Sequence, residues 1–242
     1  MVAHRGSKGT APENTIAAFK EALRVGSDGI ELDVHLSKDG IPVVIHDESI
    51  NRTTNGKGYV KDLTVAELQQ YDAGSWFHTR FSGEKIPTLE EVMEVLIEHD
   101  FEGMLNIELK TDQIPYLGIE RIVLDLVRSY QPRFTTIYSS FNYETMERLT
   151  KLDRRAEFAL LFSEKGKNLT KLPSGRVVKA WHPRHTLLPY LLSTKSVTIP
   201  IRVWTVNRRL HMAYCFVNKV DTIITDFPEK ALKVRKLLQR EK

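Results

Sequence analysis

The stretch GIELDVHLSKDGIPVVIHD at residues 29–47 contains two apolar runs separated by a short polar turn. The runs are Gly29–Val34 and Pro42–Asp47, and both are rich in the β-branched residues that favour strands. The turn Ser37–Gly40 is too short for the crossover helix that two parallel strands require. We therefore expect the two runs to pair as an antiparallel hairpin.

The turn also predicts which side chains of the hairpin meet. A two-residue turn centred on Lys38 and Asp39 places Glu31 opposite His46. Asp33 is two residues beyond Glu31, so it lies on the same face of the strand. The predicted hairpin by itself therefore brings two carboxylates and one histidine together on one face.

Seven further apolar runs with strand character flank this hairpin. They are Val2–His4, Met104–Lys110, Thr135–Ser140, Glu157–Phe162, Val177–His182, Ile201–Asn207 and Thr222–Asp226. Amphipathic, helix-like stretches lie between most of them, and such alternation is typical of a parallel sheet. A barrel of eight strands needs one run fewer than the nine present, and the hairpin accounts for the extra one. The predicted fold is a TIM-like (β/α)8 barrel that forms one domain over residues 1–242.

Helix boundaries are visible in several of the intervening stretches. Asn14 is a plausible N-cap for a helix that begins near Ile16. Thr88 and Glu91 have the spacing of a capping box, and Pro228 stands where the last helix should begin. Residues 48–86 break the pattern, because they are polar, rich in glycine and too long for an ordinary loop. We expect them to form a small inserted lobe after the third strand.

Composition limits the class of protein. The chain has 242 residues, a net charge of +4 and a single cysteine, Cys215, so no disulfide can form within it. Basic residues are scattered, which argues against a nucleic-acid-binding surface. No run approaches the roughly 20 apolar residues of a membrane span, and the first residues lack the apolar core of a signal peptide. We expect a cytoplasmic protein with a small-molecule substrate and no transmembrane segment; the oligomeric state is left open.

Polar residues recur at the carboxyl ends of the predicted strands, which meet at one face of a barrel. Glu31, Asp33 and Glu108 are hard oxygen donors on otherwise apolar strands, and a divalent cation would compensate their burial. Mg²⁺ is favoured over Ca²⁺ because the chain is expected to be intracellular. The alternative is a plain ion network in which Arg5 and Lys110 neutralise the three acids.

Two histidines end strands close to these acids. His4 and His46 suit acid–base chemistry near neutral pH, which cleavage of a phosphodiester requires. Arg5 and Lys110 would then bind the phosphate oxygens. Three more strand-end residues are candidates for contact with the rest of the substrate: Phe141, His182 and Trp204. Aromatic residues at Trp181 and in the insert, Trp76 and Phe77, are further candidates for the same wall.

Taken together and in order, these motifs resemble the glycerophosphodiester phosphodiesterase family. The matching segments are 3–6 (AHRG), 11–15 (APENT), 29–34 (GIELDV), 37–40 (SKDG), 43–47 (VVIHD), 52–54 (RTT), 72–77 (DAGSWF), 86–92 (IPTLEEV), 106–110 (NIELK), 139–141 (SSF), 204–207 (WTVN) and 225–228 (TDFP). Residues 163–176 are polar and have no recognisable counterpart in the family.

The resemblance implies an activity and roles for the site residues. It implies metal-dependent hydrolysis of glycerophosphodiesters to glycerol 3-phosphate and an alcohol, on a TIM-like barrel. Glu31, Asp33 and Glu108 would hold the metal, and His4 and His46 would act as acid and base. A lysophospholipase D-like or phosphoinositide-type phosphodiesterase on the same barrel is the nearest alternative. A non-catalytic phosphodiester-binding module is the alternative from another class, although no proposed catalytic position is lost here.

Overall fold

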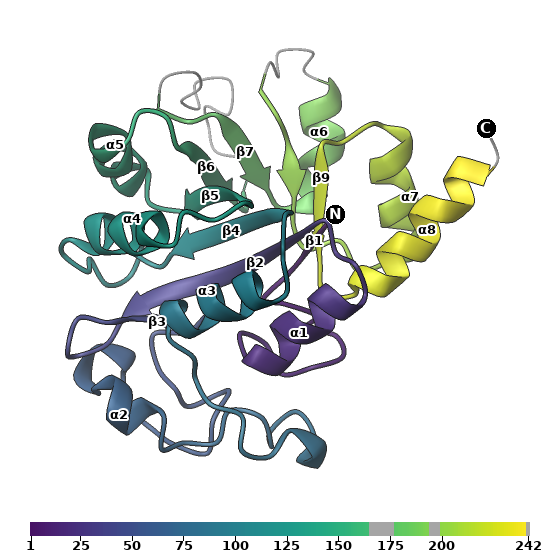
Figure 1. Ribbon diagram of the computed structural model, residues 1–242. Coiled ribbons are helices and arrows are strands. Elements are labelled where there is room, and N and C mark those ends of the chain that lie inside the picture. Colours follow the sequence, from purple (N-terminus) through teal and green to yellow (C-terminus); the bar gives the residue numbers. More distant parts are fainter. Residues whose placement is uncertain (165–176, 194–198, 241–242) are drawn as a thin grey trace.

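The computed structural model describes residues 1–164, 177–193 and 199–240, with the side chain of Arg240 excepted. Within these residues nine strands form one sheet (Figure 1). They are β1 (Val2–Ala3), β2 (Gly29–Leu36), β3 (Pro42–Val44), β4 (Met104–Leu109), β5 (Thr135–Ser140), β6 (Glu157–Phe162), β7 (Ala180–Pro183), β8 (Arg202–Val203) and β9 (Thr222–Thr225). The predicted runs recover all nine, with shifts of a few residues at the ends of β7 and β8.

Eight of these strands run parallel in the order β7-β6-β5-β4-β2-β1-β9-β8. The two ends of this order meet, because bridges join Trp181 to Ile201 and Arg184 to Trp204. The sheet therefore curls into a TIM-like barrel, which confirms the predicted fold class. β3 lies off this path and pairs with β2, antiparallel, as the hairpin prediction requires. On its other side, Val43 forms a single antiparallel bridge with Thr88.

Helices surround the barrel on its outside (Figure 1). They are α1 (Ile16–Arg24), α3 (Leu89–Glu98), α4 (Ile119–Ser129), α5 (Tyr143–Leu152), α6 (Leu188–Ser193) after the 3-10 turn η4 (His185–Leu187), α7 (Arg209–Val217) and α8 (Pro228–Arg240). The capping box of Thr88 and Glu91 at α3 and the start of α8 at Pro228 are confirmed. The N-cap of α1 is Thr15, whose side chain accepts a hydrogen bond from the Ala18 amide, and not Asn14.

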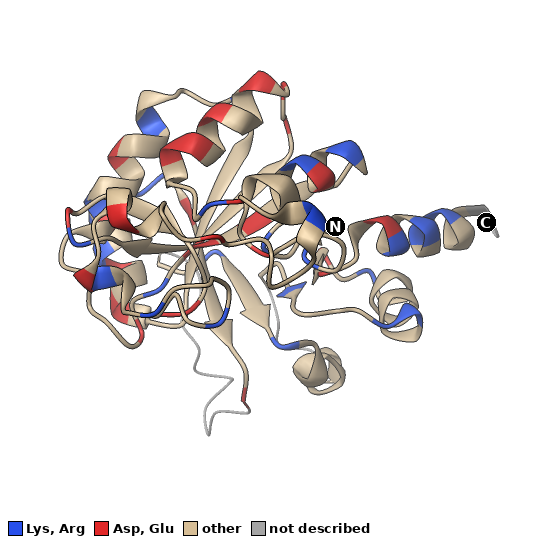
Figure 2. Ribbon diagram, turned by 90° about the horizontal axis from the view of Figure 1, so that it is seen from below, with Lys and Arg blue, Asp and Glu red and all other residues tan. Residues whose placement is uncertain are grey.

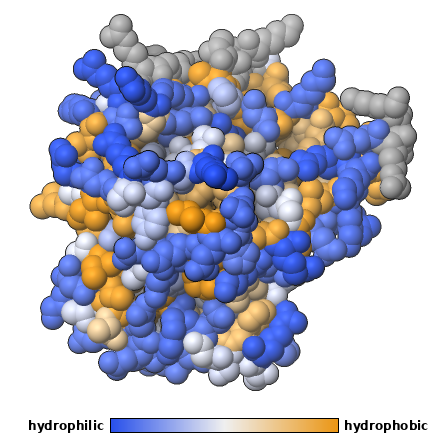
Figure 3. Space-filling view, viewed as in Figure 1, coloured by the Kyte–Doolittle hydropathy of each residue, from blue (hydrophilic) through white to orange (hydrophobic). Residues whose placement is uncertain are grey.

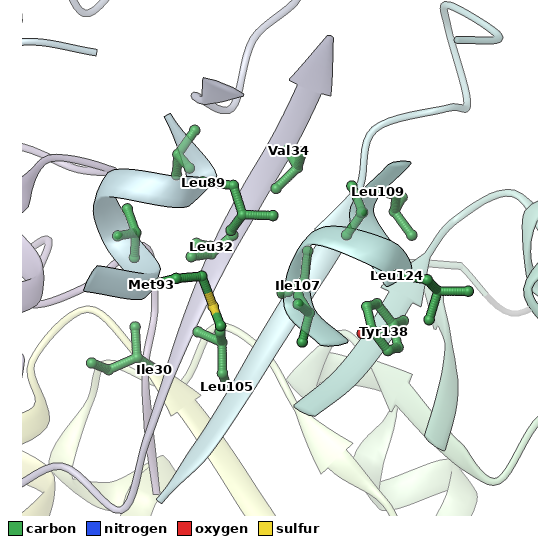
Figure 4. Packing of buried hydrophobic residues seen from close by; sticks show 14 of the residues in the cluster. Ile30, Leu32, Val34, Leu89, Met93, Leu105, Ile107, Leu109, Leu124 and Tyr138 are labelled. Carbon is green, nitrogen blue, oxygen red and sulfur yellow. The ribbon is translucent and has the colours of Figure 1, made fainter. Parts of the chain in front are cut away.

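Strand alternation separates the core from the barrel interior. On β2 the side chains of Ile30, Leu32 and Val34 point outward and pack under α3 (Figure 4). On β4 Leu105, Ile107 and Leu109 do the same toward α3 and α4 (Figure 4). Because side chains of a strand alternate between faces, the residues between them must point into the barrel. The apolar layer outside thus fixes polar residues of β2 and β4 inside.

The hairpin prediction was right about the pairing but wrong about its register. Val34 pairs with Val44 and Leu36 with Pro42, one residue away from the predicted alignment. The turn contains three residues instead of two, because Gly40 adopts a left-handed conformation with φ of +76°. The ladder ends at Val44, so His46 follows the strand and does not stand opposite Glu31.

The chain between β3 and α3 forms the lower left part of the molecule in Figure 1. It contains two 3-10 turns and a short helix: η1 (Val60–Asp62), α2 (Val65–Leu68) and η2 (Thr79–Phe81). A separate apolar cluster supports it, made of Val43, Ile45, Ile50, Val60, Leu68, Ala73 and Ile86. This cluster continues from β3, so the segment is anchored to the hairpin.

Charges of both signs occur on the helices, as Figure 2 shows. On the face drawn in Figure 3, hydrophobic residues form patches between hydrophilic ones. Across the described ranges, none of the helices has the length and apolar character needed to cross a membrane.

Candidate active site

A cavity of about 160 Å³ opens where the carboxyl ends of the barrel strands meet. Its size suits a small ligand, because pockets for drug-sized molecules start at roughly 300 Å³. The residues that line it are His4, Arg5, Glu31, His46, Asn106, Glu108, Phe141, Leu161, Trp204, Thr205 and Ile224. Of the residues predicted for the site, Asp33, Lys110 and His182 are not among this lining.

Three carboxylates gather on one side of the cavity. Glu31 and Asp33 are on β2 and Glu108 is on β4, where the parallel register places Asp33 beside Glu108. One oxygen from each lies within 4.8 Å of the others, and all three residues are buried. Oxygen ligands on opposite sides of one Mg²⁺ or Ca²⁺ ion stand roughly 4–5 Å apart. The group therefore has the donor atoms and the spacing to bind a divalent cation.

Without such a cation, burial and the neighbouring charges shift the pKa values of these three carboxyl groups away from their usual range. Burial, with the charges of Asp33 and Glu108, raises the pKa of Glu31 well above its usual range. Burial also raises the pKa of Glu108, although Lys110 opposes this. Asp33 differs: burial acts to raise its pKa, but Arg5, His46, Lys110 and the hydrogen bond from Asn14 together hold it below the usual range. A bound divalent cation would allow all three carboxyls to ionise together.

Arg5 and Lys110 are the two cations beside the carboxylates. Nε of Arg5 lies 3.2 Å from Oδ2 of Asp33, and Nζ of Lys110 lies 2.8 Å from Oε1 of Glu108. Despite burial, neighbouring carboxylates hold the pKa of both residues above their usual range, so both stay charged. Among the described residues, the Glu31 carboxylate accepts one hydrogen bond, of 2.8 Å from the backbone amide of Arg5. Three acids around two cations leave an excess of negative charge.

His4 follows β1, and its imidazole is hydrogen-bonded to an aspartate. Its Nδ1 lies 2.6 Å from Oδ1 of Asp226, at the end of β9. Oδ2 of Asp226 accepts a hydrogen bond of 2.7 Å from the Asn207 amide, which fixes the carboxylate. Burial lowers the pKa of His4, while the bond to Asp226 acts in the opposite direction. The Nε2 side of the ring is thereby left to face the cavity.

His46 follows β3 and has a comparable partner. Its Nδ1 lies 2.6 Å from Oδ1 of Asp47, and its Nε2 lies 3.4 Å from Nζ of Lys110. Burial lowers its pKa, with Arg5 and Lys110 acting in the same direction. The backbone carbonyl of His46 lies 3.0 Å from Nε2 of the buried His35. The loop that carries His46 is thus tied to the barrel interior.

The opposite side of the cavity is apolar. Phe141 and Trp204 meet edge to face with ring centroids 5.6 Å apart, and Leu161 lies beside them. His182 is fully buried behind this wall, where its carbonyl accepts a hydrogen bond of 2.6 Å from Nε1 of Trp204. His182 is therefore absent from the cavity lining, and its predicted contact with the substrate stays a prediction. The predicted aromatic candidates of the insert, Trp76 and Phe77, pack against each other and do not line the cavity.

Several residues of the site were not singled out from the sequence. Asn106 lines the cavity with neither amide atom hydrogen-bonded to a described residue, and it precedes Glu108 by two positions on β4. That spacing alone puts both on the inward face, so strand alternation could have identified it. Asn14, misassigned as a helix cap, instead donates a hydrogen bond of 2.9 Å to Oδ2 of Asp33. Nothing in the local sequence indicates this contact.

Comparisons with known proteins point to one family. Residues 4–230 match the glycerophosphoryl diester phosphodiesterase family. A glycerophosphodiester phosphodiesterase of Caldanaerobacter subterraneus subsp. tengcongensis is 41% identical, over 97% of this chain and 96% of its own length. One from Bacillus altitudinis is 39% identical, over 97% of both chains.

Solved structures give the same result. A phosphodiesterase of Oleispira antarctica, in complex with the product sn-glycerol-3-phosphate, superimposes with a TM-score of 0.88 at 30% identity, covering 97% of this chain and 96% of its own. A glycerophosphodiester phosphodiesterase of Agrobacterium tumefaciens has a TM-score of 0.78 at 32% identity, covering 95% of this chain and 97% of its own. The chain therefore belongs to the glycerophosphoryl diester phosphodiesterase family.

Proposed function

We propose that this phosphoric diester hydrolase cleaves glycerophosphodiesters to glycerol 3-phosphate and an alcohol, with one bound Mg²⁺ ion and two histidines as acid and base. The observation that carries the proposal is the convergence of two carboxylates, one arginine and two histidines on one small cavity. Asp33 and Lys110 lie directly against these residues and complete the group of three carboxylates and two cations. The Oleispira antarctica relative, crystallised with sn-glycerol-3-phosphate, supports the identity of the product.

Glu31, Asp33 and Glu108 would hold the cation. When bound, a divalent cation polarises the phosphoryl group and offsets the charge that develops on its oxygens. We propose Mg²⁺, because three carboxylates leave the remaining coordination positions to water and phosphate, as is usual for Mg²⁺ in proteins.

Arg5 and Lys110 bind the non-bridging phosphate oxygens. Both are charged, Lys110 is buried and Arg5 is largely shielded from solvent, and both already lie against the carboxylates. Buried cations that are fixed in place stabilise transition-state charge without reorganisation during the reaction.

His46 acts as the base and His4 as the acid. His46 removes the proton from the attacking oxygen as that oxygen forms its bond to phosphorus. His4 protonates the alcohol oxygen as its bond to phosphorus breaks, so charge and protons balance. Asp47 and Asp226 fix the two imidazoles through their Nδ1 atoms. The attacking oxygen is that of water, or the neighbouring glycerol hydroxyl through a cyclic phosphate.

Phe141, Leu161 and Trp204 form the wall that faces the rest of the substrate. An apolar wall opposite the carboxylates accommodates carbon atoms of the glycerol or of the leaving alcohol and excludes water from that side. We also propose that the enzyme acts in the cytoplasm, where a lone thiol such as that of Cys215 stays reduced. Immunoblotting of separated cell fractions would test this location.

The decisive experiment measures release of glycerol 3-phosphate from glycerophosphocholine by metal-stripped protein, with and without Mg²⁺ or Ca²⁺. We expect release that depends on added metal and disappears in Glu108→Ala. Glu120→Ala is the matched control, because Glu120 is a buried glutamate that pairs with Arg148 on the outer helices.

The same protein is assayed in parallel with micellar lysophospholipid as the substrate. Faster cleavage of the micellar substrate would replace the proposal with the lysophospholipase D-like alternative. Binding of glycerophosphocholine without cleavage of either substrate would favour the non-catalytic module.

A further inference from the structure

The guanidinium of Arg52 lies between two carboxylates outside the cavity wall. Its Nε and Nη2 lie 2.7 and 3.0 Å from the oxygens of Asp47. Its Nη2 and Nη1 lie 2.7 and 3.1 Å from the oxygens of Glu13. Both contacts are two-pronged, the geometry that makes arginine–carboxylate pairs strong and directional.

Each of these carboxylates holds a residue of the site. Asp47 binds Nδ1 of His46 at 2.6 Å. Glu13 accepts a hydrogen bond of 2.7 Å from Nη1 of Arg5. The contacts form a continuous chain from His46 through Asp47, Arg52 and Glu13 to Arg5. It connects the loop after β3 to the loop after β1, which are separated in the sheet by β2.

We propose that Arg52 is a positioning residue that holds the base His46 and the phosphate-binding Arg5 toward the same cavity by clamping Asp47 to Glu13. The inference rests on the proposed roles of His46 and Arg5. Arg52 is absent from the cavity lining, so it acts through the two carboxylates and not through contact with the substrate.

The charge of Arg52 matters as well as its shape. The charged groups that face His46 are Asp47, Asp33, Arg5 and Lys110. Removal of Arg52 leaves Asp47 with His46 as its only remaining ion-pair partner among the described residues. The Asp47 charge then stabilises the imidazolium more fully, so the pKa of His46 should rise.

Arg52→Ala should therefore change three measured quantities together. We expect kcat for glycerophosphocholine to fall about 10- to 100-fold, as is usual when a residue that orients a functional group is removed. KM should rise because Glu13, which holds Arg5, is no longer fixed by Arg52. The acid limb of the pH–kcat/KM profile should move to higher pH.

Arg52→Lys keeps the charge but cannot span two carboxylates with paired bonds. It should recover less than a tenth of the lost kcat. Guanidinium added to Arg52→Ala should recover more than an equal concentration of methylammonium. Recovery of full activity by lysine would overturn the clamp, because charge alone would then suffice.

Arg148→Ala is the matched control. Arg148 and Arg52 have the same side-chain exposure, 43%, and each pairs with a buried glutamate, Glu120 or Glu13. Arg148 lies on α5, outside the site. Its replacement should lower the unfolding temperature about as much as Arg52→Ala while leaving kcat, KM and the pH profile unchanged. Equal kinetic loss in both variants would reduce the role of Arg52 to stability and overturn the proposal.

A double-mutant cycle separates action through Asp47 from independent effects. If Arg52 acts through Asp47, then Arg52→Ala combined with Asp47→Asn should be hardly slower than Asp47→Asn alone. Fully additive losses would overturn the proposal.

The NMR titration of His46 in isotopically labelled Arg52→Ala gives a readout that needs no turnover. An upward shift of its pKa supports the clamp even if glycerophosphocholine proves not to be the substrate. An unchanged pKa in a protein that cleaves this substrate overturns the inference and leaves the proposed function standing.

Discussion

Nζ of Lys110 lies 3.4 Å from Nε2 of His46 and 2.8 Å from Oε1 of Glu108. A charged lysine can only donate a hydrogen bond, so Nε2 of His46 must be the acceptor. The proton of the neutral imidazole then sits on Nδ1 and is donated to Asp47. Lys110 thus selects the tautomer of His46 that a general base needs. Through its contact with Glu108, it also holds His46 beside the carboxylates.

The pH dependence of kcat/KM should report this histidine. A base must be unprotonated, so kcat/KM should fall as pH drops through the pKa of His46. Burial, Arg5 and Lys110 hold that pKa below 6.5, and we expect the acid limb below this pH. The limb should keep its position when Mg²⁺ is exchanged for Mn²⁺, whereas a limb that moves with the ion would indicate a metal-bound water.

His4→Ala should abolish most turnover without weakening metal binding. Acid–base groups contribute about 10²- to 10⁴-fold to rate, and no contact joins His4 to the three carboxylates in the described residues. Steady-state kinetics with calorimetric titration of Mg²⁺ separates the two effects. A leaving group of low pKa, such as p-nitrophenol, should restore much of the rate if His4 is the acid. Rate restored equally in His46→Ala would contradict the assignment.

In the metal-free protein, ionisation of Glu108 should lower stability as pH rises above the ordinary glutamate pKa of 4.5, whereas histidines with lowered pKa values, such as His4 and His46, act in the opposite direction. Burial raises the pKa of Glu108 in the folded state, so the folded protein binds more protons than the unfolded one in this range, and ionisation favours unfolding. Thermal unfolding from pH 4.5 to 8 measures the slope. The Glu108 contribution is the difference between the parent protein and Glu108→Gln: with rising pH, stability should fall less, or rise more, in Glu108→Gln. Equal slopes in the two proteins would contradict the raised pKa.

Asn106→Leu should stabilise the metal-free protein and impair the enzyme. The amide is 1% exposed and has no hydrogen-bond partner among the described residues, a situation that costs about 1–3 kcal/mol. Leucine has a similar size and removes this cost, but it also removes a polar group from the cavity. The free energy of unfolding measured in urea should therefore rise, whereas kcat/KM should fall.

Asn142→Leu is the control for that experiment. Asn142 uses both ends of its amide, toward the Thr111 carbonyl and the Glu144 amide, and it caps α5. Its replacement should destabilise the protein. Equal loss of stability in both leucine variants would contradict the prediction, because the Asn106 amide would then have to be hydrogen-bonded in the folded protein.

Asp72→Ala should loosen the segment between β3 and α3, which we propose to be a lobe that opens separately from the barrel. The Asp72 carboxylate accepts hydrogen bonds from the backbone amides of Gly74, Ser75 and Gly83 at 2.7–2.8 Å. Without them, limited proteolysis should cut between residues 74 and 84 first, while the barrel fragments stay associated. Cleavage that starts in the barrel helices would contradict a separate unit.

The sequence by itself determined the barrel and most of its site. Alternating strands and helices, and a turn too short for a crossover, were sufficient to predict eight parallel strands with one antiparallel hairpin. The period of two on β2 and β4 fixed Glu31, Asp33 and Glu108 on the inward face, because their neighbours Leu32 and Ile107 have to be covered by helices. Local patterns of this kind need no knowledge of distant contacts.

The tertiary structure decided what depends on a single turn or on contacts between distant loops. Gly40 lengthened the hairpin turn by one residue, and His46 reached the cavity from a loop and not from the strand face. Asn14 donates a hydrogen bond to Asp33, and His182 lies behind Trp204. Arg52 joins Asp47 to Glu13 across 39 positions of the chain. Such contacts follow from how loops meet at the end of a closed barrel, and closure is a property of all eight strands together.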